Sequence, residues 1–132
     1  MFLLDTNILT GIYKNDNLIL KNLAKKTDDQ FSTCLFCVSE ILYGINRLPS
    51  SKRKLDFELF YGRLFTDIIM LDFTFEAAVA FADIKLKSRN QGNIIEDSDL
   101  LIAATAIANE AILVTRNIEH FERISGLEVV EW

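Results

Sequence analysis

The sequence predicts a three-layer α/β/α domain, in which helices cover both faces of a mostly parallel sheet of short strands. Three observations indicate this fold class. Short apolar runs alternate with longer segments whose apolar residues have helical spacing. The chain has 132 residues, which is the usual size of one domain. No linker, internal repeat or low-complexity segment divides residues 1–132, so we expect a single domain.

The short apolar runs are the expected strands. They span Phe2 to Leu4, Phe31 to Leu35, Ile68 to Leu71, Ala111 to Thr115 and Leu127 to Val130. The expected helices fill the intervals: Ile8 to Lys26 with a break near Asn15, Val38 up to Pro49, a segment through Phe57 and Leu64, Thr74 up to Gly92, Asp97 to Ala108, and Ile118 to Arg123. Strands that alternate with helices in this way are typical of a parallel sheet.

Two helices in the middle of the chain have the clearest periodicity. The first carries apolar residues at i, i+3, i+4 and i+7, namely Val38, Ile41, Leu42 and Ile45. The second repeats this spacing with Phe57, Phe60, Tyr61 and Leu64. Together with Phe65, these aromatic residues could line a groove for an amphipathic partner segment, although for any one of them a place in the ordinary core is the better interpretation.

The two following helices have recognisable ends. Thr74 can cap a helix that Gly92 terminates. One face of this helix carries Phe75, Ala78, Val79, Ala82 and Leu86. Asp97 or Ser98 is expected to cap the next helix, which is apolar nearly all round and should therefore be buried.

Composition limits the functional classes. Net charge is −5, so bulk charge does not indicate a nucleic-acid binder. Basic residues form two local groups, at 52–54 and 85–89, which could be solvated helix faces or could guide a phosphate backbone. No run is long enough to span a membrane and the N-terminus has no basic segment before an apolar one, so we expect a cytoplasmic protein.

Acidic residues recur where the expected strands end. Asp5 follows the first strand, and Glu40 lies about one helical turn after the second. Asp99 lies in the first turn of the buried helix, and Asn117 follows the fourth strand. Because ligands bind beyond the carboxyl ends of parallel strands, all four side chains can point at one edge of the sheet.

Three carboxylates brought together need a counter-charge. Two of them a few ångströms apart repel by about 4 kcal/mol at an effective dielectric constant near 20. Mg²⁺ and Mn²⁺ favour oxygen ligands and would compensate this repulsion. Each residue also has a simpler interpretation: Asp5 as a helix N-cap, Glu40 as a capping acid, Asp99 as helix-dipole compensation, and Asn117 as a turn residue.

The sequence as a whole resembles the PIN-domain ribonucleases, and within them the VapC-type toxins of prokaryotic toxin–antitoxin pairs. Five strings carry the resemblance in order: L-D-T-N at the start, S-E-I-L-Y-G at 39–44, D-L-L-I-A-A at 99–104, L-V-T-R-N at 113–117, and the closing H-F-E-R-I-S-G-L-E-V-V-E-W.

The resemblance implies a function and a set of site residues. Asp5, Glu40 and Asp99 match the three metal-coordinating, catalytic acids, and the supporting polar positions match Thr6, Asn7, Thr115 and Asn117. The family implies Mg²⁺-dependent endonucleolytic cleavage of RNA, with Mn²⁺ as a substitute. It also implies a homodimer and a cognate antitoxin whose C-terminal arm covers the active site, forming a hetero-oligomer.

From these residues we expect Asp5, Glu40 and Asp99 to hold one Mg²⁺, directly or through water. An activated water would attack the phosphodiester in line and leave a 5′-phosphate and a 3′-hydroxyl. A basic antitoxin tail would place an Arg or Lys among the carboxylates and displace the metal. His120, the one histidine, is interpreted as a surface or packing residue.

Three alternative functions stay open. Cys34 and Cys37 form a C-x-x-C motif, as in thioredoxin-like proteins, although two buried thiols explain it better. A receiver-type signalling domain would use Asp72 as phosphoacceptor but would need a Lys where Arg116 stands. A third alternative keeps the fold without catalysis, as a binding module with an acidic groove.

Overall fold

One sheet of five parallel strands organises the molecule. The computed structural model describes residues 1–132. The strands lie in the order β3-β2-β1-β4-β5, and every neighbouring pair is parallel. Their bounds are β1 (Phe2–Leu4), β2 (Phe31–Cys34), β3 (Ile69–Leu71), β4 (Ile112–Thr115) and β5 (Val129–Glu131). The predicted α/β fold class and the five strands are confirmed.

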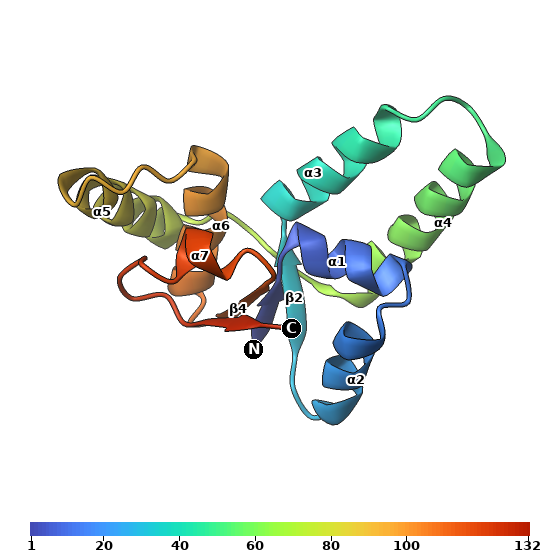
Figure 1. The fold of residues 1–132 in the computed structure, drawn as a ribbon, viewed down its shortest axis with the longest axis horizontal. Coiled ribbons are helices and arrows are strands. Elements are labelled where there is room, and N and C mark those ends of the chain that lie inside the picture. Colours follow the sequence, from blue (N-terminus) through green and yellow to red (C-terminus); the bar gives the residue numbers. More distant parts are fainter.

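Helices cover both faces of this sheet. They are α1 (Thr6–Tyr13), α2 (Asn17–Lys25), α3 (Leu35–Asn46), α4 (Lys52–Asp67), α5 (Phe75–Asn90), α6 (Asp97–Ala108) and α7 (Ile118–Phe121). In Figure 1, α1 to α4 lie to the right of the central strands and α5 to α7 to the left. This division follows from the strand order, because right-handed crossovers that run in opposite directions along a sheet place their helices on opposite faces.

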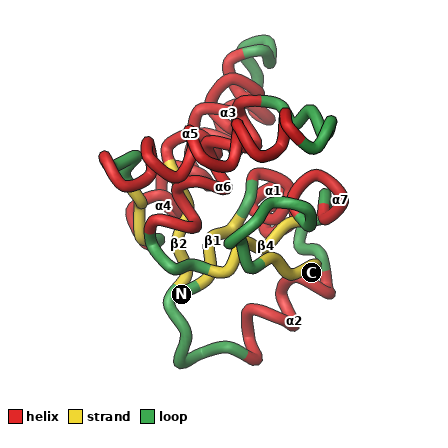
Figure 2. The backbone as a smooth tube through the Cα atoms, turned by 90° about the vertical axis from the view of Figure 1, so that its left-hand side faces the viewer, coloured by secondary structure: helices red, strands yellow, loops and turns green.

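The strand order reverses beside β1. The chain passes from β1 to β2 and β3 on one side, and then crosses to β4 and β5 on the other. Leu4 at the end of β1 pairs with Val114 near the end of β4, so the two carboxyl ends lie level with one another. Figure 2 shows β1, β2 and β4 side by side. A crevice forms at such a reversal because the connections leave in opposite directions.

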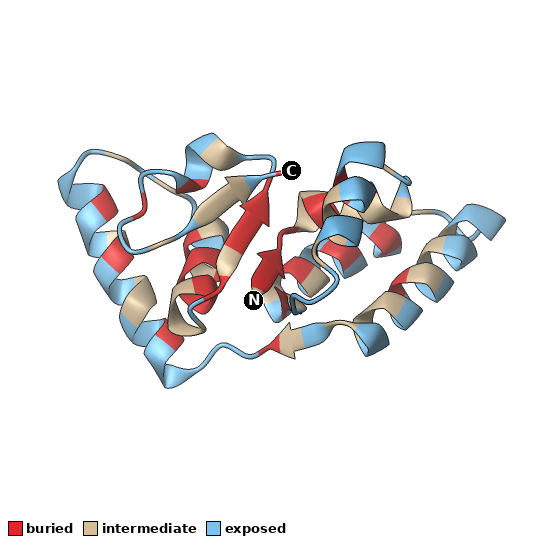
Figure 3. Ribbon diagram, turned by 90° about the horizontal axis from the view of Figure 1, so that it is seen from below, coloured by how far each residue is buried: buried red, intermediate tan, exposed pale blue.

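The core lies between the central strands and the helices that cross them. Leu3, Leu4, Leu113 and Val114 are fully or almost fully buried. In Figure 3 the strand that begins at the N-terminus is buried throughout, whereas the outer faces of the long helices are exposed. The predicted burial of α6 is also found, because its residues from Ile102 to Ala106 are all buried. No helix is long and apolar enough to cross a membrane.

The predicted start of α3 and the predicted cap of α6 are wrong, whereas the predicted bounds of α6, Asp97 to Ala108, are confirmed. Helix α3 begins at Leu35 rather than Val38, because Leu35 and Phe36 extend the apolar run of β2 and gave no sign of the change. Helix α6 has Glu96 at its N-cap position, and no side chain caps it. Asp97 instead forms an ion pair with Lys85, with Oδ1 and Nζ 2.9 Å apart. By contrast, the predicted Thr74 cap of α5 is confirmed, since its hydroxyl accepts from Ala77 N–H at 3.3 Å.

The apolar stripe predicted on α5 faces outward. Phe75 is 80% exposed, Val79 55% and Leu86 61%. The buried positions of α5 are instead Ala77, Ile84 and Ser88. Helix α5 packs on α6 through its buried side, so Phe75, Val79 and Leu86 are left exposed in the monomer.

Candidate active site

A polar cleft of about 550 Å³ lies at the carboxyl ends of β1 and β4. None of its 14 lining residues is hydrophobic; they are Asp5, Thr6, Asn7, Thr10, Gly11, Lys14, Asp16, Glu40, Glu96, Ser98, Asp99, Arg116, Asn117 and His120. The three predicted acids therefore share one cleft with Thr6, Asn7 and Asn117. Thr115 lies beneath it and is fully buried.

Asp5 occupies the floor of the cleft, directly after β1. Its side chain is the N-cap of α1, because Oδ1 accepts from the Thr6 N–H at 2.7 Å. Its other oxygen, Oδ2, accepts from the Thr115 hydroxyl at 2.7 Å and from Asn7 Nδ2 at 3.3 Å. The capping role and the cleft position are therefore compatible, and Asp5 has both.

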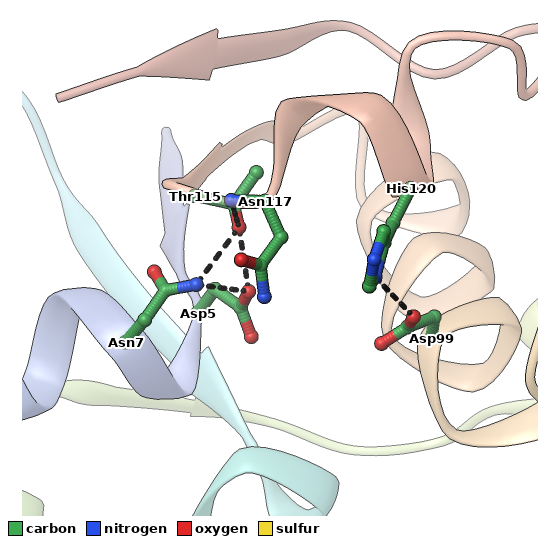
Figure 4. A network of polar contacts seen from close by, with 6 residues as sticks. All are labelled: Asp5, Asn7, Asp99, Thr115, Asn117 and His120. Carbon is green, nitrogen blue, oxygen red and sulfur yellow. Dashed lines mark hydrogen bonds and ion pairs between the residues drawn. The ribbon is translucent and has the colours of Figure 1, made fainter.

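Asn7 and Thr115 join the two central strands around Asp5. Asn7 Nδ2 donates to Thr115 Oγ1 at 3.2 Å, and its Oδ1 accepts from the Arg116 backbone N–H at 3.1 Å. Thr115 Oγ1 also accepts from the Asn117 N–H at 3.0 Å. Figure 4 shows Asp5, Asn7, Thr115 and Asn117 gathered on one side of the site. This network fixes the orientation of the Asp5 carboxylate.

Asp99 faces Asp5 from the other side of the site (Figure 4). Its Oδ2 lies 3.1 Å from Nδ1 of His120 on α7. His120 is exposed at the surface, as predicted, but its ring also lines the cleft and contacts a predicted metal ligand, which the prediction did not include. Its position three residues after Asn117, on the helix that directly follows β4, was the available signal.

Glu40 approaches from α3, where its side chain is exposed. The Thr6 hydroxyl donates a hydrogen bond to its Oε2. Because α3 begins at Leu35 rather than at Val38, Glu40 lies beyond the first turn of the helix. The rigid helix thus holds the third acid over the residue that follows Asp5.

The electrostatics of the cleft disfavour bare carboxylates. Burial raises the pKa of Asp5, and the nearby charge of Asp99 adds to the rise despite the opposing hydrogen bonds from Thr115 and Thr6. Burial also raises the pKa of Asp99, with further contributions from Glu40 and the cleft residue Glu96, while His120 opposes the shift. Both acids therefore lack a sufficient counter-charge of their own.

The donor set suits a hard cation. Carboxylate, hydroxyl and amide oxygens line the cleft, and no thiol or apolar side chain is among its lining residues, although the buried Cys37 Sγ lies 3.8 Å from Asp5 Oδ1 behind it. No group of three His, Cys, Asp or Glu side chains is close enough to enclose a metal ion alone. These oxygen ligands suit an ion that keeps several of its own waters, as Mg²⁺ usually does, rather than one enclosed by protein side chains alone.

Sequence reasoning missed several cleft residues. Lys14, Asp16, Glu96 and Arg116 were not among the predicted site residues, and they line the cleft through loops that join the elements. Arg116 Nη2 and Asp16 Oδ2 form an ion pair at 2.7 Å. Loop residues of this kind carry no periodic signal, so only the folded chain brings them together.

The alternative functions find little support. Cys34 and Cys37 are free and buried, with their sulfurs 3.7 Å apart, as expected for core thiols. Asp72 is exposed after the edge strand β3 and does not line the cleft, which removes the phosphoacceptor that a receiver domain needs. Of the two basic groups, neither lines the cleft itself, and Arg53 alone borders an adjoining cavity.

Comparisons with known proteins agree with this geometry. Residues 2–127 match the family model described as PIN domain. A ribonuclease VapC2 of Rickettsia felis is 32% identical over 100% of this chain and 98% of its own length. A tRNA(fMet)-specific endonuclease VapC of Shigella flexneri is 29% identical over 99% and 97%. The crystal structure of VapBC2 from Rickettsia felis bound to a promoter DNA fragment contains a chain that is similar with a TM-score of 0.86 and 30% identity, over 99% of this chain and 98% of that one.

Proposed function

Because this chain belongs to the PIN domain family, and within it to the VapC ribonucleases, we propose that it cleaves RNA as the endoribonuclease toxin of a type II toxin–antitoxin pair. The observation that carries the proposal is the cleft at the β1–β4 reversal, which Asp5, Glu40 and Asp99 line together and which has no apolar lining residue. The three acids are intact, which favours an active enzyme over a silent binding module. A cytoplasmic location, where RNA is accessible, is part of the same proposal.

Asp5, Glu40 and Asp99 would hold Mg²⁺, or Mn²⁺ in its place, directly or through water. The ion would lower the pKa of a water molecule and offset negative charge on the phosphodiester oxygens. The raised pKa values of Asp5 and Asp99 support this role, because such a pair of acids gains most from a positive ion between them.

The other residues hold these acids in place. Thr115 and the Thr6 N–H fix both oxygens of Asp5, and the Thr6 hydroxyl fixes Glu40. His120 orients Asp99. The Asn117 side chain lies beside Asp5 (Figure 4), where it could accept or donate one further hydrogen bond to a bound phosphate. Groups that orient metal ligands in this way typically change activity by about 10- to 100-fold when they are removed.

The experiment for this proposal is cleavage of total RNA by the purified, antitoxin-free chain in Mg²⁺, in Mn²⁺ and in EDTA, with analysis of the fragment ends. We expect cleavage with either metal and none in EDTA, with 5′-phosphate and 3′-hydroxyl ends. Fragments with 2′,3′-cyclic phosphates would contradict attack by a water. A folded protein that leaves RNA uncut under both metals would favour the binding module.

A cognate antitoxin is the proposed protein partner. A second cavity of about 300 Å³ adjoins the acidic cleft and is lined by Ile41, Ile45, Leu48, Phe57 and Tyr61 on its apolar side. An apolar side chain of the antitoxin fits this cavity, and a basic residue beyond it would reach the carboxylates. Two of the aromatic residues predicted to form a groove, Phe57 and Tyr61, line this cavity. The other two, Phe60 and Phe65, pack around Tyr61 against the core.

A homodimer is the proposed assembly of the toxin. The exposed residues Phe75, Val79 and Leu86 give α5 an apolar outer face, which monomers rarely leave uncovered. Sedimentation of the wild type and of Val79→Glu tests this: a dimer that becomes a monomer supports the α5 interface, and an unchanged dimer excludes it.

A further inference from the structure

Positive charge lies at only one end of the acidic cleft. At the α1 end, the adjoining 300 Å³ cavity shares Lys14 with the cleft and adds Arg53. At the α6 end, another cavity of about 290 Å³ is lined by Asn93, Ile94, Ile95, Glu96, Asp99, Glu119 and His120. This end contains three acids and no Lys or Arg. A polyanion bound across the cleft therefore finds cations in one direction only.

Arg116 is held at the rim of the cleft by three contacts. Its backbone N–H donates to Asn7 Oδ1 at 3.1 Å, and its Nε donates to the Trp132 carbonyl at 3.0 Å. Its Nη2 pairs with Asp16 Oδ2 at 2.7 Å. A guanidinium has five N–H donors, and these side-chain contacts occupy two of them. The side chain is 39% exposed and already ordered, so it can bind an anion with little further loss of conformational freedom.

Lys14 lies on the same side of the cleft. It is the C-cap residue of α1, and it is exposed where the cleft meets the 300 Å³ cavity. Its ammonium forms no ion pair with any carboxylate of the chain. An unpaired ammonium beside a group of carboxylates is free to meet an incoming phosphate.

The charge of the cleft makes such contacts necessary. Its lining contains five carboxylates and two permanent cations. A bound divalent ion would still leave the cleft net negative. The negative charge of the cleft therefore repels the RNA phosphates, unless the phosphates on either side of the cleaved bond contact Lys or Arg side chains.

We infer that Lys14 and Arg116 bind backbone phosphates of the RNA strand on the α1 side of the acids, so that the strand leaves the cleft towards Arg53. This inference rests on the proposed ribonuclease function, and it specifies the end of the cleft at which the RNA strand leaves. The acidic α6 end, with Glu96 and Glu119, is the side that the strand avoids.

Arg116 also has a structural explanation, which the test must separate. Asp16 caps α2 by accepting from Leu18 and Ile19 N–H, and Trp132 is buried, so Arg116 ties the α1–α2 turn to the C-terminus. A purely structural tie affects thermal stability but not the salt dependence of RNA binding. Lys14 makes no such structural contact, so loss of a phosphate contact there should change the salt dependence of RNA binding and leave the thermal stability unchanged.

The experiment measures binding of a labelled, mixed-sequence single-stranded RNA over a salt series in Ca²⁺, a hard cation that does not favour the octahedral geometry of Mg²⁺. The variants are Lys14→Met, Arg116→Met and the double variant, and the control is Lys21→Met, an exposed lysine on α2 outside the cleft. We expect the slope of log affinity against log salt to fall by about 0.7 for each lost contact and by about 1.4 in the double variant. Wild-type slopes in all variants, or an equal fall in Lys21→Met, would overturn the inference.

Asp16→Asn resolves the structural explanation. If Arg116 binds phosphate, this variant keeps the wild-type salt slope although the ion pair is gone. If Arg116 has only a structural role, Arg116→Met keeps the wild-type salt slope and lowers the melting temperature, as Asp16→Asn does. That result would overturn the inference for Arg116. Cleavage by the wild type is measured separately, so uncut RNA counts against the proposed function, and unchanged slopes count against the phosphate contacts.

Discussion

Replacement of Thr115 by Val tests how the fold holds a buried carboxylate. The substitution keeps the shape of a fully buried side chain and removes one hydroxyl. That hydroxyl donates to Asp5 Oδ2 at 2.7 Å and accepts from the Asn117 N–H at 3.0 Å. A hydrogen bond to a charged group contributes about 1.5–3 kcal/mol, so we expect Thr115→Val to lower the free energy of unfolding at neutral pH by roughly 2–3 kcal/mol.

The loss should depend on pH. The folded-state pKa of Asp5 lies above its ordinary value of 3.8, so the Asp5 charge costs no stability at low pH and destabilises the fold as pH rises through the folded pKa. The Thr115 hydrogen bond lowers this pKa, so its removal raises the pKa further and enlarges the penalty at neutral pH. Once Asp5 is protonated, only a neutral hydrogen bond is missing, and the loss should shrink to about 1 kcal/mol.

Chemical denaturation at neutral pH and at a pH below 3.8 measures the difference, and Thr33→Val is the matched control. Thr33 is also fully buried in a central strand, but its hydroxyl donates to the Leu4 carbonyl at 3.0 Å. We expect the control to lose about 1 kcal/mol at both pH values. Equal, pH-independent losses in the two variants would refute the idea that Thr115 stabilises a charged Asp5.

Three further predictions concern the cleft and its support. His120→Ala should weaken Mn²⁺ binding at least about tenfold in a calorimetric titration, because Asp99 loses the group that orients it; unchanged affinity would assign His120 no such role. Gly11→Ala should lower the free energy of unfolding by about 1–3 kcal/mol, because a Cβ there collides with the buried Ile19 side chain, whereas Gly44→Ala meets nothing and should not destabilise α3. Mg²⁺ at about 100 times its Kd should stabilise the wild type by about 2.7 kcal/mol in thermal melts, and a chain that melts identically in EDTA would contradict a metal site.

The sequence predicted the strands and the three acids because each depends on a local pattern. Asp5 closes a short apolar run, and Asp99 lies in the first turn of a helix that is apolar nearly all round. Because ligands bind beyond the carboxyl ends of parallel strands, both residues are expected at one edge of the sheet. In the structure they line a single cleft, together with Glu40.

The remaining features depend on tertiary contacts that no local pattern encodes. Arg116 reaches Asp16 and Trp132 only after β4, the α1–α2 turn and the C-terminus come together. His120 joins the site because α7 packs beside α6. The start of α3 was missed because Leu35 and Phe36 continue an apolar run, which periodicity alone cannot divide between a strand and a helix.

The most direct test of the account compares two acids on the first turn of α6. Asp99 lines the cleft, whereas Asp97 lies outside it and pairs with Lys85. Asp99→Asn and Asp97→Asn remove the same charge from the same helix end, and RNA cleavage in Mg²⁺ is the measurement. We expect Asp99→Asn to lower the activity at least about a hundredfold and Asp97→Asn to keep it, because only the first removes a proposed metal ligand. Equal activity in the two folded variants would contradict a catalytic acid cluster in this cleft.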